Sequence, residues 1–270
     1  MKLGFVFIMY VASSFVVFNS CSSLVEKNNS NKKEEIVKIE IKVQKELVTF
    51  FSEDSLIITA DLYTHKNIEE APFIILFHQA GYSRGEYVES VGKFIEMGYN
   101  CLAVDLRAGN EVNGIINETH KEAVAKGLST EYVDAMPDML AAIEYVKNNF
   151  EFGELLILGS SYSASLALII AAQSPDMVDG VLAFSPGEYF KYDDTTIEEY
   201  ASEILVPVFI SSSREERKKW KAIYEALPDD AKRKYIPEEE GVHGSRALWK
   251  TTEGNQKYWK AVEKFIKKIE

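Results

Sequence analysis

Apolar and polar residues alternate along residues 37–63, and a polar run at 52–55 interrupts the alternation. This pattern predicts two antiparallel strands joined by a turn. From residue 73 onward, short continuous apolar runs alternate with stretches of helical spacing. Uninterrupted runs of Ile, Leu and Val are typical of a parallel sheet buried on both faces. The pattern therefore predicts an α/β fold, with a mostly parallel central sheet, helices on both faces and an antiparallel hairpin at its start. The expected strands are 73–77, 101–104, 155–158, 181–184, 208–210 and 233–237, and the expected helices are 87–97, 132–148, 165–172, 215–227 and 258–269.

Composition narrows the classes of protein that remain. With 270 residues, 46% of them hydrophobic, the chain is long enough for one domain with a substantial core. A net charge of -12 argues against a nucleic-acid partner, because phosphate binding requires a basic face. No metal-ligand cluster, phosphate-binding loop or dinucleotide-binding turn is apparent in the sequence. We therefore expect neither a cofactor nor a metal.

The first twenty residues predict export. A short basic start and an apolar segment over residues 1–20 are typical of a signal peptide. Cys21 follows a small residue at the end of this segment, which resembles the bacterial lipoprotein signal, although Phe18 replaces the usual leucine. An ordinary signal peptide cut nearby is the alternative. We expect residues 21–36 to form a flexible tether and 37–270 the domain, with the protein exported and held to a bacterial membrane by a lipid on Cys21.

One segment predicts a nucleophile. The apolar strand at residues 155–158 runs into Gly159-Ser160-Ser161-Tyr162-Ser163, and an apolar helical pattern follows. A Gly-x-Ser-x-small turn between a strand and a helix presents one serine hydroxyl on a sharp, strained bend. Ser161 is therefore the candidate nucleophile, and we expect the rival hydroxyls of Ser160 and Ser163 to point into the packing. Such a serine needs a histidine base, a carboxylate and an oxyanion hole.

The segment after the strand at 73–77 resembles a known family. His78-Gln79-Ala80-Gly81 is similar to the oxyanion turn of the α/β-hydrolase superfamily, in the variant found in dienelactone-hydrolase-like and esterase-like members. The resemblance covers residues 46–269, although Ser163 replaces the usual final glycine of the nucleophile turn. It implies an oxyanion hole made by the Tyr162 N–H with the N–H of Ala80, or alternatively of Gln79. By the general logic of catalytic triads, His78 is more easily interpreted as a hydrogen-bonding brace for this loop than as the base.

The resemblance also implies the base and the acid. Gly241-Val242-His243-Gly244, after the last predicted strand, resembles the family's histidine turn, so His243 is the expected base; His65 and His120 are more easily interpreted as surface residues. Counting from Pro207 places Glu215 at the position of the acid. Glu216 is one residue away and remains an alternative, and Glu188 is a more distant one. Either Glu215 or Glu216 could instead only begin a helix.

Other segments have less specific interpretations. Asp105-Leu106-Arg107 resembles a family loop that supports the site, and Cys101 is interpreted as a small buried strand residue. No large cap is expected before the strand at 208–210. Residues 109–130 are expected to form the longest irregular loop, and such loops are often functional.

Together these observations predict a serine hydrolase that cleaves carboxylic esters or related acyl compounds through Ser161, His243 and Glu215, with a small-molecule acyl substrate. A peptidase or an acyltransferase with the same triad is an alternative, because a triad does not specify the scissile bond or the acceptor. A catalytically inactive, surface-anchored binding protein of the same fold is a third.

Overall fold

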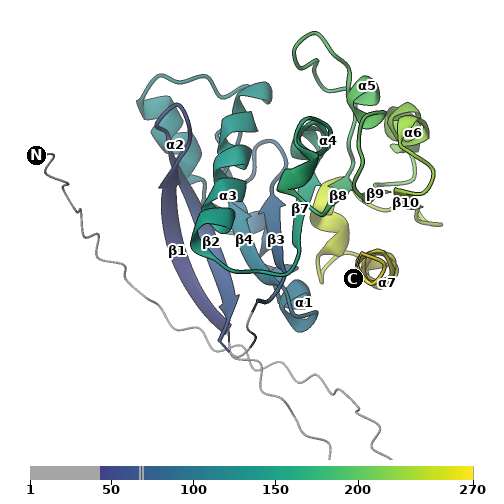
Figure 1. Ribbon diagram of the computed structural model, residues 1–270, viewed down its shortest axis with the longest axis horizontal. Helices are drawn as coiled ribbons and strands as arrows, with labels where there is room; N and C mark the ends of the chain where they lie inside the picture. Colours follow the sequence, from purple (N-terminus) through teal and green to yellow (C-terminus); the bar gives the residue numbers. More distant parts are fainter. Residues whose placement is uncertain (1–42, 67, 69, 270) are drawn as a thin grey trace, which may run out of the picture.

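The fold is built on one mixed sheet. The structure is a computed structural model that describes residues 43–66, 68 and 70–269, so the predicted signal peptide, Cys21 and the tether lie outside the described residues. Within these residues the main sheet has the order β1-β2-β4-β3-β7-β8-β9-β10 (Figure 1). Its strands are β1 (Val43–Phe51), β2 (Ile57–His65), β3 (Phe73–Phe77), β4 (Asn100–Val104), β7 (Leu155–Ser160), β8 (Gly180–Phe184), β9 (Val208–Ser211) and β10 (Lys232–Tyr235).

Strand direction confirms the predicted architecture. The strand β1 pairs antiparallel with β2, and β2 pairs antiparallel with β4. All the remaining pairs in this sheet, from β4 to β10, are parallel. The predicted N-terminal hairpin and the mostly parallel sheet are therefore both present.

The register of the parallel strands places their ends at one edge. Phe77 at the end of β3 pairs with Gly159 of β7, and Phe184 at the end of β8 pairs with Ser160 and with Ser211 of β9. The residues that follow these strands are therefore neighbours. This is the edge at which open parallel sheets bind their ligands.

Helices cover both faces of the sheet, as predicted. Buried residues of α1 (Val91–Glu96) and α7 (Asn255–Ile266) belong to one hydrophobic cluster, on one face. The other face carries a larger cluster, to which the remaining helices contribute (Figure 1). These helices are α2 (Glu118–Ala125), α3 (Met136–Asn149), α4 (Tyr162–Gln173), α5 (Ile197–Ala201) and α6 (Arg217–Ala226).

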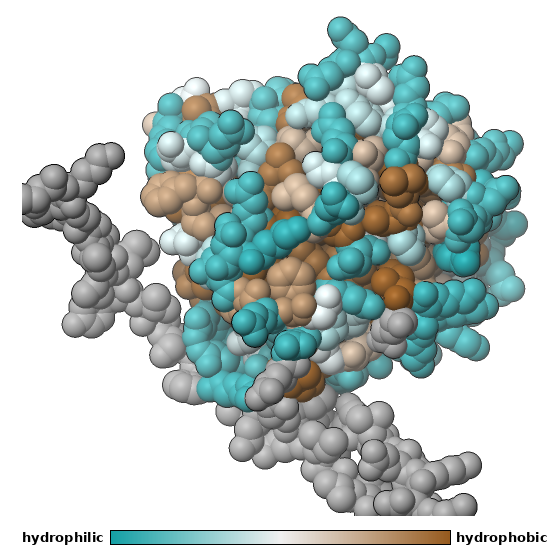
Figure 2. Space-filling model, in the orientation of Figure 1, coloured by the Kyte–Doolittle hydropathy of each residue, from teal (hydrophilic) through white to brown (hydrophobic). Residues whose placement is uncertain are grey.

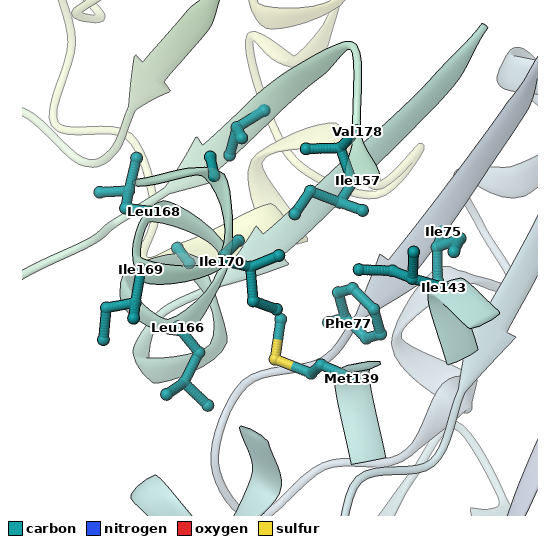
Figure 3. Packing of buried hydrophobic residues seen from close by; sticks show 14 of the residues in the cluster. Ile75, Phe77, Met139, Ile143, Ile157, Leu166, Leu168, Ile169, Ile170 and Val178 are labelled. Atoms are coloured by element: carbon teal, nitrogen blue, oxygen red, sulfur yellow. The ribbon is translucent and has the colours of Figure 1, made fainter. Parts of the chain in front are cut away.

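The helix α4 lies deepest in this arrangement. Its residues from Tyr162 to Ala171 are all buried, and its sequence is apolar on every side. Figure 3 shows Ile170 of α4 beside Met139 of α3, with Phe77 of β3 on the other side of the methionine. Full burial of a side chain of this size contributes roughly 1.5 to 3 kcal/mol to folding. The helix that follows the candidate nucleophile is therefore held rigidly against the sheet.

Residues 109–130 are more regular than predicted. They contain the two-stranded pair β5 (Glu111–Val112) and β6 (Ile115–Ile116), followed by α2. The Asn117 side chain caps this helix by accepting the His120 N–H at 2.8 Å. The expectation of an irregular loop was wrong because two-residue strands are too short to show alternation, while the capping asparagine was a signal for the helix.

Most of the surface is polar. In the view of Figure 2 hydrophilic residues cover most of the outline and hydrophobic residues gather toward the middle, and the most exposed large hydrophobic residues are Phe51 and Leu205. Cys101 is fully buried on β4, as predicted, and burial raises the pKa of its thiol. Among the described residues, no helix has the length and apolar character needed to cross a bilayer.

Candidate active site

Ser161 occupies the bend between β7 and α4. Its backbone has φ 62° and ψ -121°, in a region that residues with a side chain rarely adopt. The bend is fixed because the Ser161 N–H donates to the carbonyl of Phe184 at 2.7 Å and its carbonyl accepts the Ala164 N–H at 3.0 Å. Strain of this kind persists only where the surrounding structure enforces it, and it is frequent at active sites. The predicted nucleophile turn is therefore present.

Gly159 is required by the tightness of this turn. A Cβ at Gly159 would lie 2.5 Å from both the Cα and N atoms of Ala164. Backbone atoms of a buried helix cannot move aside at low cost, so we expect Gly159→Ala to lower the free energy of unfolding by about 1 to 3 kcal/mol. Urea denaturation of the purified protein measures this change.

Gly92→Ala is the matched control for Gly159→Ala. Gly92 lies in α1, where an added Cβ would meet no atom within 4 Å. In a helix this change is expected to be neutral or to stabilise by up to about 1 kcal/mol. An unfolding midpoint for Gly159→Ala equal to that of the wild type would contradict the packing of the turn.

The two rival hydroxyls point into the packing, as expected. Ser160 Oγ donates to Glu86 Oε1 at 2.7 Å and accepts the Ser245 N–H at 2.9 Å. Ser163 Oγ donates to the Phe77 carbonyl at 2.9 Å. Ser160 and Ser163 are both fully buried. The serine in the usual glycine position therefore fits the turn and ties it to β3.

His243 lies against Glu216. His243 Nδ1 is 2.6 Å from Glu216 Oε1. The second oxygen of this carboxylate, Oε2, accepts the Ser185 hydroxyl at 2.8 Å, and Ser185 Oγ accepts the Gly244 N–H at 2.8 Å. Ser185 therefore links the carboxylate to the histidine loop. This role of Ser185 was not predicted, although a position directly after β8, at the carboxyl edge of the sheet, was a signal for it.

The pKa of Glu216 is about 2, well below its usual value. Partial burial opposes ionisation, but hydrogen bonds from His243 and Ser185 outweigh it. The side chain of Glu216 is 12% exposed and that of His243 38% exposed. At neutral pH the histidine therefore faces an ionised carboxylate that is mostly shielded from water.

The assignment of the acid to Glu215 needs correction. Glu215 is exposed, and the structure pairs Glu216 with His243. The chain between β9 and α6 forms a turn that the Arg214 N–H fixes by donating to the Glu240 carbonyl at 2.8 Å. Adjacent residues of such a turn point in different directions, so only one of the two glutamates can face the histidine loop. Counting positions from Pro207 could not reveal which one.

Glu188, the more distant alternative, has a different role. Its carboxylate accepts the N–H groups of Ile197 and Glu198, each at 2.8 Å. These are the first N–H groups of α5, which have no acceptor inside the helix. Glu188 therefore stabilises the start of α5 and is not in contact with His243.

Of the proposed oxyanion donors, Gln79 is already engaged. Its N–H donates to Glu86 Oε2 at 2.7 Å. Among the described residues the Ala80 N–H has no hydrogen-bond acceptor, and Tyr162 is the first residue of α4, where an N–H has no intrahelical acceptor. The structure therefore leaves Ala80 and Tyr162 as the candidate pair and removes Gln79.

His78 is the brace that was predicted. Its Nε2 accepts the Leu106 N–H at 2.8 Å, so the proton lies on Nδ1, which donates to the Gln79 carbonyl at 2.8 Å. Burial lowers the pKa of His78 to about 4. A neutral, fully buried imidazole therefore fixes the oxyanion turn.

Asp105 and Arg107 also support this edge of the sheet. Asp105 accepts the Arg84 guanidinium at 2.6 Å, and Arg107 contacts Asp138 at 2.6 Å and Asp54 at 2.7 Å. The hydrogen bond from Arg107 lowers the pKa of Asp54 to about 2. These ion pairs hold the β1–β2 turn and the start of α3 beside the site, which confirms the predicted structural role.

Two further tyrosines contact residues next to the nucleophile turn and at the end of β8. The Tyr132 ring stacks on Tyr162 with ring centroids 4.8 Å apart, and Tyr189 Oη donates to the Ser185 carbonyl at 2.8 Å. Burial raises the pKa of Tyr189. The sequence reasoning assigned no role to Tyr132 or Tyr189.

A cavity of about 390 Å³ lies nearby, between the β1–β2 turn, the start of α3 and the segment after β8. Neither Ser161 nor His243 is among the residues that line it. Its lining residues are Asp54, Arg107, Val133, Asp134, Met136, Pro137, Lys191, Tyr192 and Asp193.

Comparison with known protein families identifies the family of this chain. Residues 58–227, more than half of the chain, match the model of the dienelactone hydrolase family. No curated protein sequence matches significantly.

Solved structures resemble the fold at low sequence identity. A Pyrococcus furiosus esterase is 20% identical, with a TM-score of 0.63 over 83% of this chain and 92% of its own. A dienelactone hydrolase from Anabaena variabilis is 14% identical, with a TM-score of 0.62 over 83% of this chain and 97% of its own. The chain therefore belongs to the dienelactone hydrolase family and is a hydrolase with the α/β-hydrolase fold.

Proposed function

We propose that this enzyme hydrolyses carboxylic esters or related acyl compounds through an acyl-enzyme formed on Ser161. The observation that supports this most directly is the contact of 2.6 Å between His243 Nδ1 and Glu216 Oε1. With its proton held on Nδ1 by the carboxylate, the imidazole has Nε2 free to accept a proton. The order of serine, acid and histidine along the chain is that of α/β-hydrolases.

In the first half of the reaction, Ser161 Oγ attacks the carbonyl carbon and His243 takes the hydroxyl proton, which forms a tetrahedral intermediate. The Ala80 and Tyr162 N–H groups stabilise the negative charge that develops on the carbonyl oxygen. Collapse of this intermediate breaks the bond to the leaving group, which receives the proton from His243. The products of this half are the acyl-enzyme and an alcohol.

In the second half, water replaces the leaving group. His243 takes a proton from the water, whose oxygen attacks the acyl carbon of the ester on Ser161. Collapse releases the carboxylic acid and returns the proton to Ser161. Glu216 stays ionised throughout and stabilises the imidazolium form of His243 in both halves.

Labelling tests this proposal on the wild-type protein. A fluorophosphonate reacts with an activated serine, and we expect the adduct, located by mass spectrometry of the digested protein, on Ser161. Short p-nitrophenyl esters are expected to be hydrolysed, and labelled protein to lose that activity. Hydrolysis without an adduct on Ser161 would contradict the mechanism, and transfer of the acyl group to an added alcohol in preference to water would indicate an acyltransferase.

We also propose that the enzyme is exported and held to a bacterial membrane by a lipid on Cys21. The support is the apolar segment at residues 1–20 that ends beside this cysteine. In a bacterial host the full chain is expected in the membrane fraction, and Cys21→Ala in the soluble exported fraction. Equal membrane fractions for the two chains would contradict lipidation.

A further inference from the structure

Behind the candidate active site lies a fully buried carboxylate that the proposed mechanism does not use. Glu86 belongs to η1 (Arg84–Tyr87), which follows the oxyanion turn, and its residue has no exposed surface. Its Oε2 accepts the Gln79 N–H at 2.7 Å. Its Oε1 accepts the hydroxyls of Ser160 at 2.7 Å and Ser245 at 2.6 Å.

Each of these three donors belongs to a different segment of the site. Gln79 immediately precedes Ala80 in the oxyanion turn. Ser160 immediately precedes Ser161 in the nucleophile turn, and Ser245 follows His243 by two residues. One carboxylate is therefore bonded to the three segments whose relative positions define the reaction geometry.

Further contacts make this junction tight. The Ser245 N–H donates to Ser160 Oγ at 2.9 Å, which joins the histidine loop directly to the nucleophile turn. The Trp249 Nε1–H donates to the backbone carbonyl of Glu86 at 2.6 Å, so the short helix is fixed as well. A Cβ at Gly244 would lie 2.5 Å from Ser160 Oγ, so the histidine loop and the nucleophile turn are in close contact there.

We propose that Glu86 is a positioning residue of the hydrolytic site, whose carboxylate holds the oxyanion turn, the nucleophile turn and the histidine loop in register. This inference rests on the function proposed above. Glu86 does not touch the reacting atoms and acts through Gln79, Ser160 and Ser245.

Stability alone does not account for a carboxylate at this position. A buried ionisable group costs free energy of desolvation, and well-packed apolar residues often replace buried charges without loss of stability. What a carboxylate provides, and an apolar side chain does not, is two acceptor oxygens that three donors can share. The carboxylate therefore matters for the relative positions of the three segments, because a displacement of about 1 Å at a reacting group can reduce turnover about 100-fold.

Glu86→Gln tests the proposal with nearly the same side-chain volume. Glutamine has one acceptor oxygen and an NH₂ group, so at least one of the three donors loses its acceptor. We expect kcat per fluorophosphonate-titrated site to fall about 10- to 100-fold, with KM for a p-nitrophenyl ester within about 2-fold of the wild-type value. Titration counts the folded, labelled sites, so a loss of folded protein alone does not lower this quantity.

Glu144→Gln is the matched control, because Glu144 is an exposed residue on α3. It makes the same carboxyl-to-amide change at the surface and is expected to leave both kcat and KM unchanged. If Glu86→Gln lowers only the melting temperature and retains full turnover per titrated site, the carboxylate is structural and the proposal is overturned.

Ser245→Ala provides an independent test should Glu86→Gln fail to fold. It removes one of the three donors and no charge, and we expect a loss in kcat per titrated site of about 3- to 10-fold. The combined variant is expected to lose little more than Glu86→Gln alone, because both changes affect one network. Unchanged turnover in Ser245→Ala would count against the proposal. A wild-type protein that neither labels nor hydrolyses esters would instead contradict the proposed function.

Discussion

Ser161→Ala is expected to reduce kcat for a p-nitrophenyl ester by roughly 10⁴-fold or more. The alanine has no oxygen to form the acyl-enzyme, so only the oxyanion donors and substrate binding remain to accelerate direct attack by water. Labelling by a fluorophosphonate is expected to disappear as well. Steady-state kinetics and mass spectrometry of the labelled chain measure the two effects.

Two serine variants make this test specific. Ser202→Ala removes an exposed hydroxyl at the end of α5 and is expected to leave turnover unchanged. Ser160→Ala removes the rival hydroxyl beside Ser161 and should still be labelled. Retained labelling and turnover in Ser161→Ala would refute the assignment of the nucleophile.

The second large effect is expected for Glu216→Gln. Loss of the carboxylate that faces His243 Nδ1 removes the charge that stabilises the imidazolium and allows the wrong tautomer to form. We expect kcat to fall about 10³- to 10⁴-fold at neutral pH. Glu215→Gln is the matched control, because it removes the same charge from the neighbouring, exposed residue, and its kcat is expected to stay within about 2-fold of the wild-type value. The opposite ranking of the two variants would restore the assignment of Glu215.

Glu216 also predicts a dependence of stability on pH. Its pKa is about 2 in the folded protein, against 4.5 for an unperturbed glutamate. A carboxyl whose pKa is lowered by folding stabilises the folded state above about pH 4.5, and this contribution is lost as the pH falls toward 2. The difference in melting temperature between wild type and Glu216→Gln is therefore expected to narrow over that range. A constant difference from pH 6 to pH 2.5 would argue against an ionised Glu216.

Much of the fold was predictable because buried parallel strands leave a clear signal. Short continuous apolar runs such as the one at 73–77 are typical of strands buried on both faces of a sheet, and the carboxyl ends of parallel strands meet at one edge. The chain has only four histidines, and His243 follows the last predicted strand, so His243 was the expected base. These inferences depend only on the order of strands and residues along the chain, which can be read directly from the sequence.

The sequence could not predict the direction in which a side chain points within a turn. Glu215 and Glu216 are chemically identical neighbours. The backbone hydrogen bond from the Arg214 N–H to the Glu240 carbonyl fixes the turn in which Glu216 faces the histidine loop. The same holds for Gln79, whose N–H is engaged by a carboxylate seven residues away. Both facts arise from contacts between segments, which no local pattern encodes.

The backbone at Ser161 has a further consequence. A positive φ is found both there and at Ser185, which directly follows the neighbouring strand β8 and donates a hydrogen bond to Glu216. Glycine would adopt either conformation without the steric cost of a Cβ, yet it has no hydroxyl to offer. We therefore expect glycine at either position to raise the thermodynamic stability of the fold and to lower the proposed catalytic activity.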